Sequence, residues 1–212
     1  MVYFFKPTRR MTAEEERRAM TLLEDSRREK VTACNDADRR QSRMLVYFLL
    51  RFGLYREYGV TDLPKLTAEA GGKPRLRWPE CHFNFSHDQG ACVCALGRSP
   101  LGVDVQKITS RREAVLHRAF SAAERQAVQT AENPDAAFTA IWTRKEAYGK
   151  QTGRGICYDM KRTDFSQPCR VDGMELETHW VGDYALSVCA EERQNLMILS
   201  AEDLKRVLSF LN

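Results

Sequence analysis

The pattern of apolar and polar positions along the chain predicts a mixture of helices and strands. Helices are indicated where apolar residues recur every three or four positions after a capping residue, and their starts are expected at Thr12, Asp36 or Asp38, Ser110, Ser121, Asn133 and Ser200. Strands are indicated where apolar and polar residues alternate or where a short apolar run stands between turns, namely at 82–96, 101–105, 163–166, 174–180 and 184–190.

Three of these helix starts have the pattern of a capping box, in which a hydroxyl and a carboxylate each accept a hydrogen bond from a free backbone N–H. The three pairs are Thr12 with Glu15, Ser110 with Glu113, and Ser121 with Glu124. The start at Asn133 combines a capping amide with proline in the first turn, and the glycines at 153 and 155 predict where that helix ends.

The chain also shows signs of a duplication. Residues 82–95 and residues 179–190 each place a turn before an alternating apolar strand. This likeness predicts an α+β fold of two similar α+β lobes related by a pseudo-two-fold axis. The boundary is expected near Gly102, so that residues 1–102 form one lobe and residues 103–212 the other.

Composition is that of a soluble globular protein, with 43% hydrophobic and 29% charged residues among 212. The longest strongly apolar run, 44–50, is far shorter than the roughly 20 residues that a membrane-spanning helix needs. The N-terminal stretch lacks the features of a signal peptide. The seven cysteines include no Cys-x-x-Cys pair, which argues against a zinc site and for reduced thiols. A cytoplasmic protein that does not enter a membrane is expected.

Charge is distributed unevenly between the two halves. Residues 1–102 contain 18 Lys and Arg against 13 Asp and Glu, a net charge of +5, whereas residues 103–212 have a net charge of −1. The first half also contains four arginine doublets, which begin at positions 9, 17, 27 and 39. An anionic ligand or partner is expected on this half, and both nucleic acid and a phosphorylated cofactor are candidates.

The most informative segment is 142–150, Trp-Thr-Arg-Lys-Glu-Ala-Tyr-Gly-Lys. Positions four apart lie one above the other on a helix, so Trp142, Glu146 and Lys150 share one stripe. One interpretation is an ordinary surface pair of glutamate and lysine, which stabilises a helix by about 0.2–0.5 kcal/mol. The other is that a buried helix face continues here as the wall of a polar site.

Three further segments carry candidate chemistry. Asp104 lies between valines in a strand-like run, where burial of its carboxylate is costly unless a cation or hydrogen bonds compensate, although a turn-capping aspartate has the same pattern. Residues 83–88, Phe-Asn-Phe-Ser-His-Asp, cannot be a hydrolase triad because adjacent residues do not align as nucleophile, base and orienting group. Hydroxyl, imidazole and loop amides favour a phosphate cradle instead. Gly72-Lys73-Pro74 presents a lysine on a stiff loop.

The order and spacing of these four segments resemble the signature series of the 4′-phosphopantetheinyl transferases, of the monomeric, two-lobed Sfp type. The matching residues are Gly-Lys-Pro at 72–74, Phe-Asn-Phe-Ser-His at 83–87, Gly-Val-Asp at 102–104 and the nonapeptide at 142–150. The resemblance covers roughly residues 36–190. Each motif alone is weak, but four in the family's order are specific.

The resemblance implies an enzyme that transfers the 4′-phosphopantetheine arm of coenzyme A to a serine of an acidic apo acyl or peptidyl carrier protein, with release of adenosine 3′,5′-bisphosphate. Its site would lie between the lobes. Asp104 and Glu146 would hold Mg²⁺, for which Mn²⁺ can substitute, against the pyrophosphate. Glu146 would also be the base for the carrier serine, and Lys150 would neutralise the pyrophosphate. Residues implied to bind coenzyme A are Arg40 (chosen over Arg39 and Arg43), Lys73, Pro74, Asn84, Ser86, His87, Asp104, Glu146 and Lys150.

One position departs from the family pattern. Many members have an acidic residue two positions after the strand aspartate, and here the residue is Gln106. An amide oxygen can ligate a metal directly or through a water, but it adds no charge, so weaker Mg²⁺ binding in the absence of coenzyme A is expected.

Two other functions compete with the transferase. A coenzyme A-binding protein without catalysis would share the binding residues, but the intact Glu146 and Lys150 argue against it. A nucleic-acid-binding module could use the arginine doublets, yet the chain lacks a basic stripe interleaved with aromatic residues. Neither nucleic acid nor membrane is expected as a partner.

Overall fold

The computed structural model describes residues 1–68, 74–76, 79–156 and 158–210, and it divides into two compact units. Unit 1 consists of Met1–Arg98 and Asn195–Asn212, and unit 2 of Ser99–Gln194. Each unit contains its own four-stranded sheet together with helices, so the predicted α+β class is confirmed. The pseudo-two-fold relation between lobes and a site between them stay predictions.

The sheet of unit 1 has the strand order β10-β1-β5-β4, in which β1 and β10 are parallel and the other pairs are antiparallel. A separate pair of short strands is formed by β2 and β3. The elements of this unit are β1 (Val2–Phe5), α1 (Ala13–Thr21), α2 (Asp25–Thr32), α3 (Ala37–Tyr58), β2 (Leu66–Ala68), β3 (Pro74–Leu76), β4 (His82–Asp88), β5 (Ala91–Gly97), β10 (Leu196–Ile198) and α7 (Ala201–Phe210).

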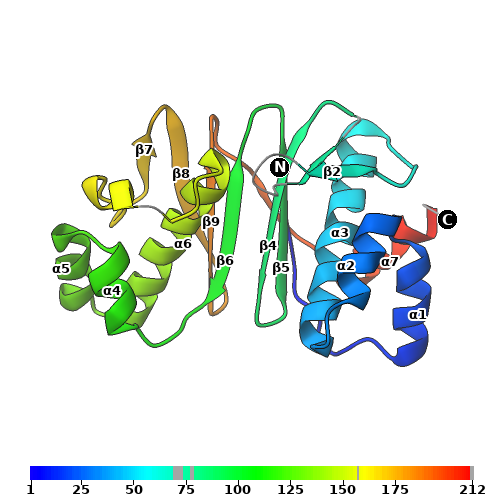
Figure 1. Ribbon diagram of the computed structural model, residues 1–212, viewed down its shortest axis with the longest axis horizontal. Coiled ribbons are helices and arrows are strands. Elements are labelled where there is room, and N and C mark those ends of the chain that lie inside the picture. Colours follow the sequence, from blue (N-terminus) through cyan, green and yellow to red (C-terminus); the bar gives the residue numbers. More distant parts are fainter. Residues whose placement is uncertain (69–73, 77–78, 157, 211–212) are drawn as a thin grey trace. The chain divides into compact units, whose positions relative to one another are not determined.

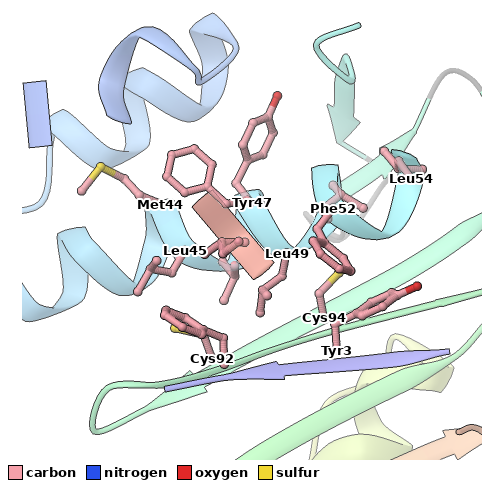
Figure 2. Packing of buried hydrophobic residues seen from close by; sticks show 14 of the residues in the cluster. Tyr3, Met44, Leu45, Tyr47, Leu49, Phe52, Leu54, Cys92 and Cys94 are labelled. Carbon is pink, nitrogen blue, oxygen red and sulfur yellow. The ribbon is translucent and has the colours of Figure 1, made fainter. Parts of the chain in front are cut away.

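Helix α3 is the centre of unit 1. It begins where the Asp36 side chain accepts a hydrogen bond from the N–H of Arg39 at 2.8 Å, and it ends at Gly59, whose positive φ of 67° suits glycine. Its apolar segment 44–50 is buried throughout, because the sheet covers one side and helices α1, α2 and α7 contact the others (Figure 1). Figure 2 shows side chains of α3 directed at Cys92 and Cys94 on β5.

The sheet of unit 2 is antiparallel throughout, with the order β6-β9-β8-β7. Helix α6 packs on β6 and β9, and α5 packs on α6 (Figure 1). The elements are β6 (Gly102–Lys107), α4 (Glu113–Ala119), α5 (Ala122–Thr130), α6 (Pro134–Thr152), a 3₁₀ helix (Tyr158–Arg162), β7 (Cys169–Val171), β8 (Met174–Val181) and β9 (Tyr184–Ala190).

The approach of α6 to β6 depends on Gly102. A Cβ atom at this position would lie 2.0 Å from the backbone oxygen of Ala147 and 2.5 Å from the backbone nitrogen of Gln151. Real Cβ atoms do not approach backbone atoms so closely, so only glycine permits this contact. The backbone of β6 therefore touches the C-terminal part of α6, two residues before Asp104.

Several predicted helix starts are confirmed. The capping boxes of Thr12 with Glu15 and of Ser121 with Glu124 are both formed, and α6 begins with Asn133 as cap and Pro134 in the first turn. The capping box predicted for Ser110 and Glu113 is wrong. Helix α4 starts only at Glu113, and its cap residue, Arg112, makes no side-chain capping bond. The N–H of Arg111 donates to Asp135 at 3.0 Å and is held outside the helix.

The strand expected at 163–166 is also wrong. A 3₁₀ helix precedes this segment, and the strand of this region, β7, lies at Cys169–Val171. The N–H of Phe165 donates to the Glu124 side chain, and the carbonyl oxygens of Phe165 and Ser166 accept from Arg144. These side-chain partners satisfy the backbone groups that a sheet would otherwise pair.

Unit boundaries differ from the expected lobes at the C-terminus. The division at Gly102 assigned all residues after it to the second lobe. The structure places the last segment in unit 1, because β10 pairs with β1 and α7 contacts α3. Strands β1 and β10 and helix α2 are elements that the apolar pattern did not indicate.

Replacement of Gly102 by alanine should destabilise unit 2. The added methyl group overlaps the backbone of α6, and relief requires that the helix move from the strand, at an expected cost of about 3 kcal/mol. Gly59→Ala serves as the comparison, because its Cβ would meet nothing within 4 Å and the cost is only left-handed backbone strain of about 1 kcal/mol. Urea unfolding measures both variants, and equal midpoints would contradict the close-contact argument.

Candidate functional site

A carboxylate and an ammonium meet where α6 crosses β6. Asp104 is 2% exposed, and Lys150 Nζ donates to its Oδ1 at 2.7 Å and to the carbonyl oxygen of Val103 at 3.1 Å. A buried aspartate at this position needs a cation or hydrogen bonds to compensate its charge, and Lys150 supplies the cation. The interpretation of Asp104 as a turn cap is therefore excluded, since it lies within strand β6.

Glu146 lies one helical turn before Lys150, on the predicted stripe with Trp142. All three side chains are partly buried, which places the stripe at the border between core and solvent. Burial raises the pKa of Glu146, the neighbouring carboxylate of Asp104 raises it further, and Lys150 opposes both effects. The carboxylates of Asp104 and Glu146 thus repel each other, and the ammonium of Lys150 offsets one of their two negative charges.

Gln106 lies on the same face of β6 as Asp104, since alternate residues of a strand share a face. Its Nε2 donates to Asp104 Oδ2 at 3.3 Å. The amide therefore contacts the carboxylate at the position where an acidic residue stands in many members of the family that the sequence resembles.

The carboxylates of Asp104 and Glu146 fit a hard divalent cation. Magnesium commonly takes one or two carboxylates from a protein and completes its shell with phosphate oxygens and water. Mutual repulsion of the pair would be relieved by such a cation. Among the described residues, no group of three or more histidine, cysteine, aspartate or glutamate side chains could hold a metal. A complete protein cage is thus absent from the described part of the chain, and the two-carboxylate arrangement suits magnesium better than zinc.

Three consecutive polar residues of α6 that precede Glu146 are buried and bonded. Thr143 Oγ1 lies 2.8 Å from Ser187 Oγ on β9. Arg144 donates to Thr178 Oγ1 on β8 and to two carbonyl oxygens of the 165–166 segment, at 2.8 to 2.9 Å. Lys145 donates to Glu124 and to a carbonyl oxygen in the 3₁₀ helix. We call residues 143–145 the anchor segment of α6.

The pair of Lys145 and Glu124 is the most buried ionic contact of unit 2. Both side chains are 0% exposed, and Nζ lies 2.9 Å from Oε1. Nζ also donates to the carbonyl oxygen of Met160 at 3.1 Å and lies 4.6 Å from the ring centroid of Phe165. Burial lowers the pKa of Lys145, and Glu124 opposes this shift. Sequence reasoning found Glu124 only as a capping residue and assigned no role to Lys145.

Three of the six candidate residues of unit 1, Asn84, Ser86 and His87, lie on strand β4. Asn84 and Ser86 share one face of the strand and are 9% and 8% exposed. His87 lies on the opposite face with Phe85, opposite Cys92 of β5. Ser86 and His87 therefore do not form one cradle on a single face, as expected for neighbours in a strand rather than a loop. Pro74 lies in β3, and Lys73 lies outside the described residues.

The basic residues near the start of α3 have distinct environments. Arg40 donates to Glu16 at 2.9 Å and to the carbonyl oxygens of Cys34 and Asn35, whereas Arg39 is exposed. Arg43 lies close to the buried Arg27, whose pKa falls to about 10 through burial and then through repulsion by Arg43.

Arg27 is a residue that the sequence argument did not single out. Its guanidinium lies 5.0 Å from the ring centroid of Phe85 and donates to the carbonyl oxygen of Arg43 at 2.6 Å. Since Phe85 and His87 share a face of β4, this cation belongs to the same face as His87. In the sequence, only the doublet of Arg27 with Arg28 indicates a possible anion-binding position, and most such arginine doublets lie on solvated helix faces.

Glu146→Gln should increase stability at neutral pH in the absence of divalent metal. The pKa of Glu146 is higher in the folded than in the unfolded state, so ionisation of this side chain lowers the free energy of unfolding. This loss of stability is complete above the folded-state pKa and disappears below the unfolded-state pKa. Urea unfolding with a chelator should therefore show a higher midpoint for the variant near about pH 7 and a vanishing difference near about pH 4. A variant less stable than the parent at neutral pH would contradict the assigned repulsion.

Comparison with known proteins identifies the family to which the chain is similar. The model of the 4′-phosphopantetheinyl transferase superfamily matches residues 100–202, which include β6 and α6. The 4′-phosphopantetheinyl transferase psf-1 of Bacillus pumilus is 33% identical over 68% of this chain and 68% of its own length. The 4′-phosphopantetheinyl transferase Sfp of Bacillus subtilis strain 168 is 24% identical over 96% of this chain and 99% of its own.

The matched segment contains Asp104, Glu146 and Lys150, the three residues that the structure brings together. The similarity to Sfp extends over nearly the whole of both chains, unit 1 included. The chain therefore belongs to the 4′-phosphopantetheinyl transferase superfamily and is an Sfp-type transferase of that family.

Proposed function

We propose that this enzyme transfers 4′-phosphopantetheine from coenzyme A to a serine of an apo acyl or peptidyl carrier protein. The single observation that carries the proposal is the cluster of Asp104, Glu146 and Lys150, formed by the two segments that match the family's strand and helix motifs. Proteins of this superfamily that resemble the chain are named for phosphopantetheinyl transfer.

The proposed reaction exchanges a pyrophosphate bond of coenzyme A for a phosphodiester bond to serine. The serine hydroxyl oxygen attacks the phosphorus that carries the pantetheine arm, and the bond from this phosphorus to the bridging pyrophosphate oxygen breaks. Adenosine 3′,5′-bisphosphate leaves with the bridging oxygen, and the serine proton passes to Glu146, directly or through a water.

Asp104 and Glu146 would hold Mg²⁺ against the pyrophosphate, with Mn²⁺ as a substitute. A bound divalent cation supplies charge neutralisation for the pyrophosphate and the leaving oxygen. Lys150 adds a second positive charge beside Asp104, from a distance of 2.7 Å. Its side chain is 28% exposed, so the ammonium can reach a phosphate oxygen at the rim of the site.

Unit 1 would bind the nucleotide part of coenzyme A. The residues proposed from sequence are Arg40, Lys73, Pro74, Asn84, Ser86 and His87. Arg27 and Arg43 support an anion-binding role, because the positive charge of Arg43 lowers the pKa of Arg27 and an anion would relieve this repulsion. The net charge of +5 on residues 1–102 suits the same ligand.

The proposed partner is an acidic carrier protein, and the proposed state is a cytoplasmic monomer. The proposed metal ligands and the proposed coenzyme A-binding residues all belong to one chain, so the proposal does not require a second copy. None of the described helices is long and apolar enough to cross a membrane.

The direct test combines the protein, coenzyme A with a labelled pantetheine arm, a purified apo carrier protein and Mg²⁺. The expected result is label on the carrier serine and release of one adenosine 3′,5′-bisphosphate per label. A panel of apo carriers then identifies the substrate by kcat/KM. Coenzyme A binding without transfer to any carrier would instead support a non-catalytic coenzyme A-binding protein.

Glu146→Gln should reduce transfer by about 1,000-fold or more, because it removes both a metal carboxylate and the proposed base. Coenzyme A binding should persist, since the nucleotide contacts are proposed for unit 1. Equilibrium binding and single-turnover transfer measure the two effects separately. Turnover by the variant close to that of the parent would contradict the assigned role.

Gln106→Glu should lower the Mg²⁺ concentration that gives half-maximal rate, by about three- to tenfold, since a third carboxylate adds attraction for the cation. The contact of Gln106 with Asp104 at 3.3 Å places this side chain beside the proposed metal ligands. Gln106→Asn is the control, because it changes the side chain at this position without adding a charge. An unchanged Mg²⁺ requirement in the glutamate variant would show that residue 106 does not face the metal.

A further inference from the structure

The proposed reaction makes no use of the most buried charges of unit 2, those of Lys145 and Glu124. Both side chains are fully buried, and burial of two charges is costly unless their geometry and additional hydrogen bonds compensate. Such a pair can often be replaced by apolar residues without loss of stability. Stability alone therefore does not explain why a buried ion pair includes Lys145, the residue directly before Glu146.

Glu124 joins three parts of unit 2 through one carboxylate. Oε2 accepts the N–H of Ser121 at 2.6 Å and so caps helix α5. Oε1 accepts the N–H of Phe165 at 2.9 Å and the ammonium of Lys145 at 2.9 Å. The carboxylate thus fixes the start of α5, the 165 segment and α6 with respect to one another.

Lys145 holds the side of α6 that faces away from the sheet. Besides Glu124, its ammonium contacts the carbonyl oxygen of Met160 and lies over the ring of Phe165. Thr143 binds β9 and Arg144 binds β8. Successive helix residues are rotated by about 100°, so the anchor segment attaches α6 in three different directions.

We propose that the buried pair of Lys145 and Glu124 positions Glu146 for catalysis by fixing the rotation of α6 about its axis. Glu146 follows the anchor segment directly, and a further rotation of about 100° turns its side chain toward β6 and Asp104. Neither Lys145 nor Glu124 contacts the proposed substrate, so both act as positioning residues. The inference rests on the proposed function, in which the separation of Glu146 and Asp104 sets the metal geometry.

The consequence of a lost anchor follows from the same geometry. Without the ammonium, the anchor segment keeps only the contacts of Thr143 and Arg144, and its hold on the rotation of α6 is weakened. A displacement of about 1 Å in a reacting group can reduce a rate about 100-fold. The rate and the metal affinity should then fall, while binding of coenzyme A through unit 1 should change little.

The test uses the full chain with Lys145→Met, with the double change Glu124→Gln and Lys145→Met, and with a control double change, Arg170→Met and Glu175→Gln. The control pair is also in unit 2, but its atoms are 3.7 Å apart and its side chains are 64% and 33% exposed. Urea unfolding, kcat, KM for coenzyme A and the Mg²⁺ concentration for half-maximal rate are measured. Mn²⁺ binding is measured by electron paramagnetic resonance without turnover.

Lys145→Met alone should unfold at lower urea, because it leaves the Glu124 carboxylate buried without its cation. The double variant should recover part of this loss, since a neutral glutamine replaces the unpaired charge. Its kcat should nevertheless stay at least about tenfold below the parent value, and its Mn²⁺ dissociation constant should rise at least about threefold. KM for coenzyme A should remain within about twofold, and the control pair should match the parent.

A double variant with parental kcat and parental Mn²⁺ affinity would overturn the positioning role. A rate loss that only follows the fraction of unfolded protein would do the same. Failure of the parent protein itself to transfer the label would count against the proposed function, while the Mn²⁺ comparison would still test the effect of the pair on the carboxylates.

Discussion

Helix α6 can lie against strand β6 only because Gly102 has no side chain. The backbone of Ala147 occupies the space that a Cβ would need, and this contact brings the helix residues Glu146 and Lys150 beside the strand residue Asp104. The position of the site therefore depends on one close backbone contact. Under our proposal the anchor segment, through Thr143 on the sheet side and Lys145 on the other, fixes the rotation of the helix about its axis.

This construction concentrates unfavourable electrostatics in one place. Burial and the neighbouring carboxylate of Asp104 raise the pKa of Glu146, so the ionised form of Glu146 opposes folding. Buried hydrogen bonds in the rest of unit 2, such as those of Arg144 to Thr178 and to the 165–166 segment, hold α6 in place despite this repulsion. Under the proposed function a divalent cation would restore the charge balance of this site, and a site that opposes folding until it is loaded is typical of enzymes that trade stability for activity.

The sequence predicts features that depend on local contacts. The helix starts at Ser121 and Asn133 follow from side chains that cap their own backbone, and the stripe of Glu146 and Lys150 follows from helical spacing. Long-range contacts are not encoded in such patterns. The burial of Lys145 depends on its contacts with Glu124 and Met160, which are distant in sequence, so it could not be predicted from local pattern. The place of the C-terminal segment in unit 1 likewise depends on the pairing of Val2 with Leu196. The roles of the unit 1 residues in coenzyme A binding remain predictions.

The central claim is that Asp104 and Glu146 form a divalent metal site against a pyrophosphate. Anomalous diffraction from crystals grown with Mn²⁺ and coenzyme A tests it most directly. The account predicts one strong anomalous peak in contact with both carboxylates and with pyrophosphate oxygens, at metal–oxygen distances of about 2.0–2.2 Å. A metal bound elsewhere, or coenzyme A bound while Lys150 remains the only cation at Asp104, would contradict it.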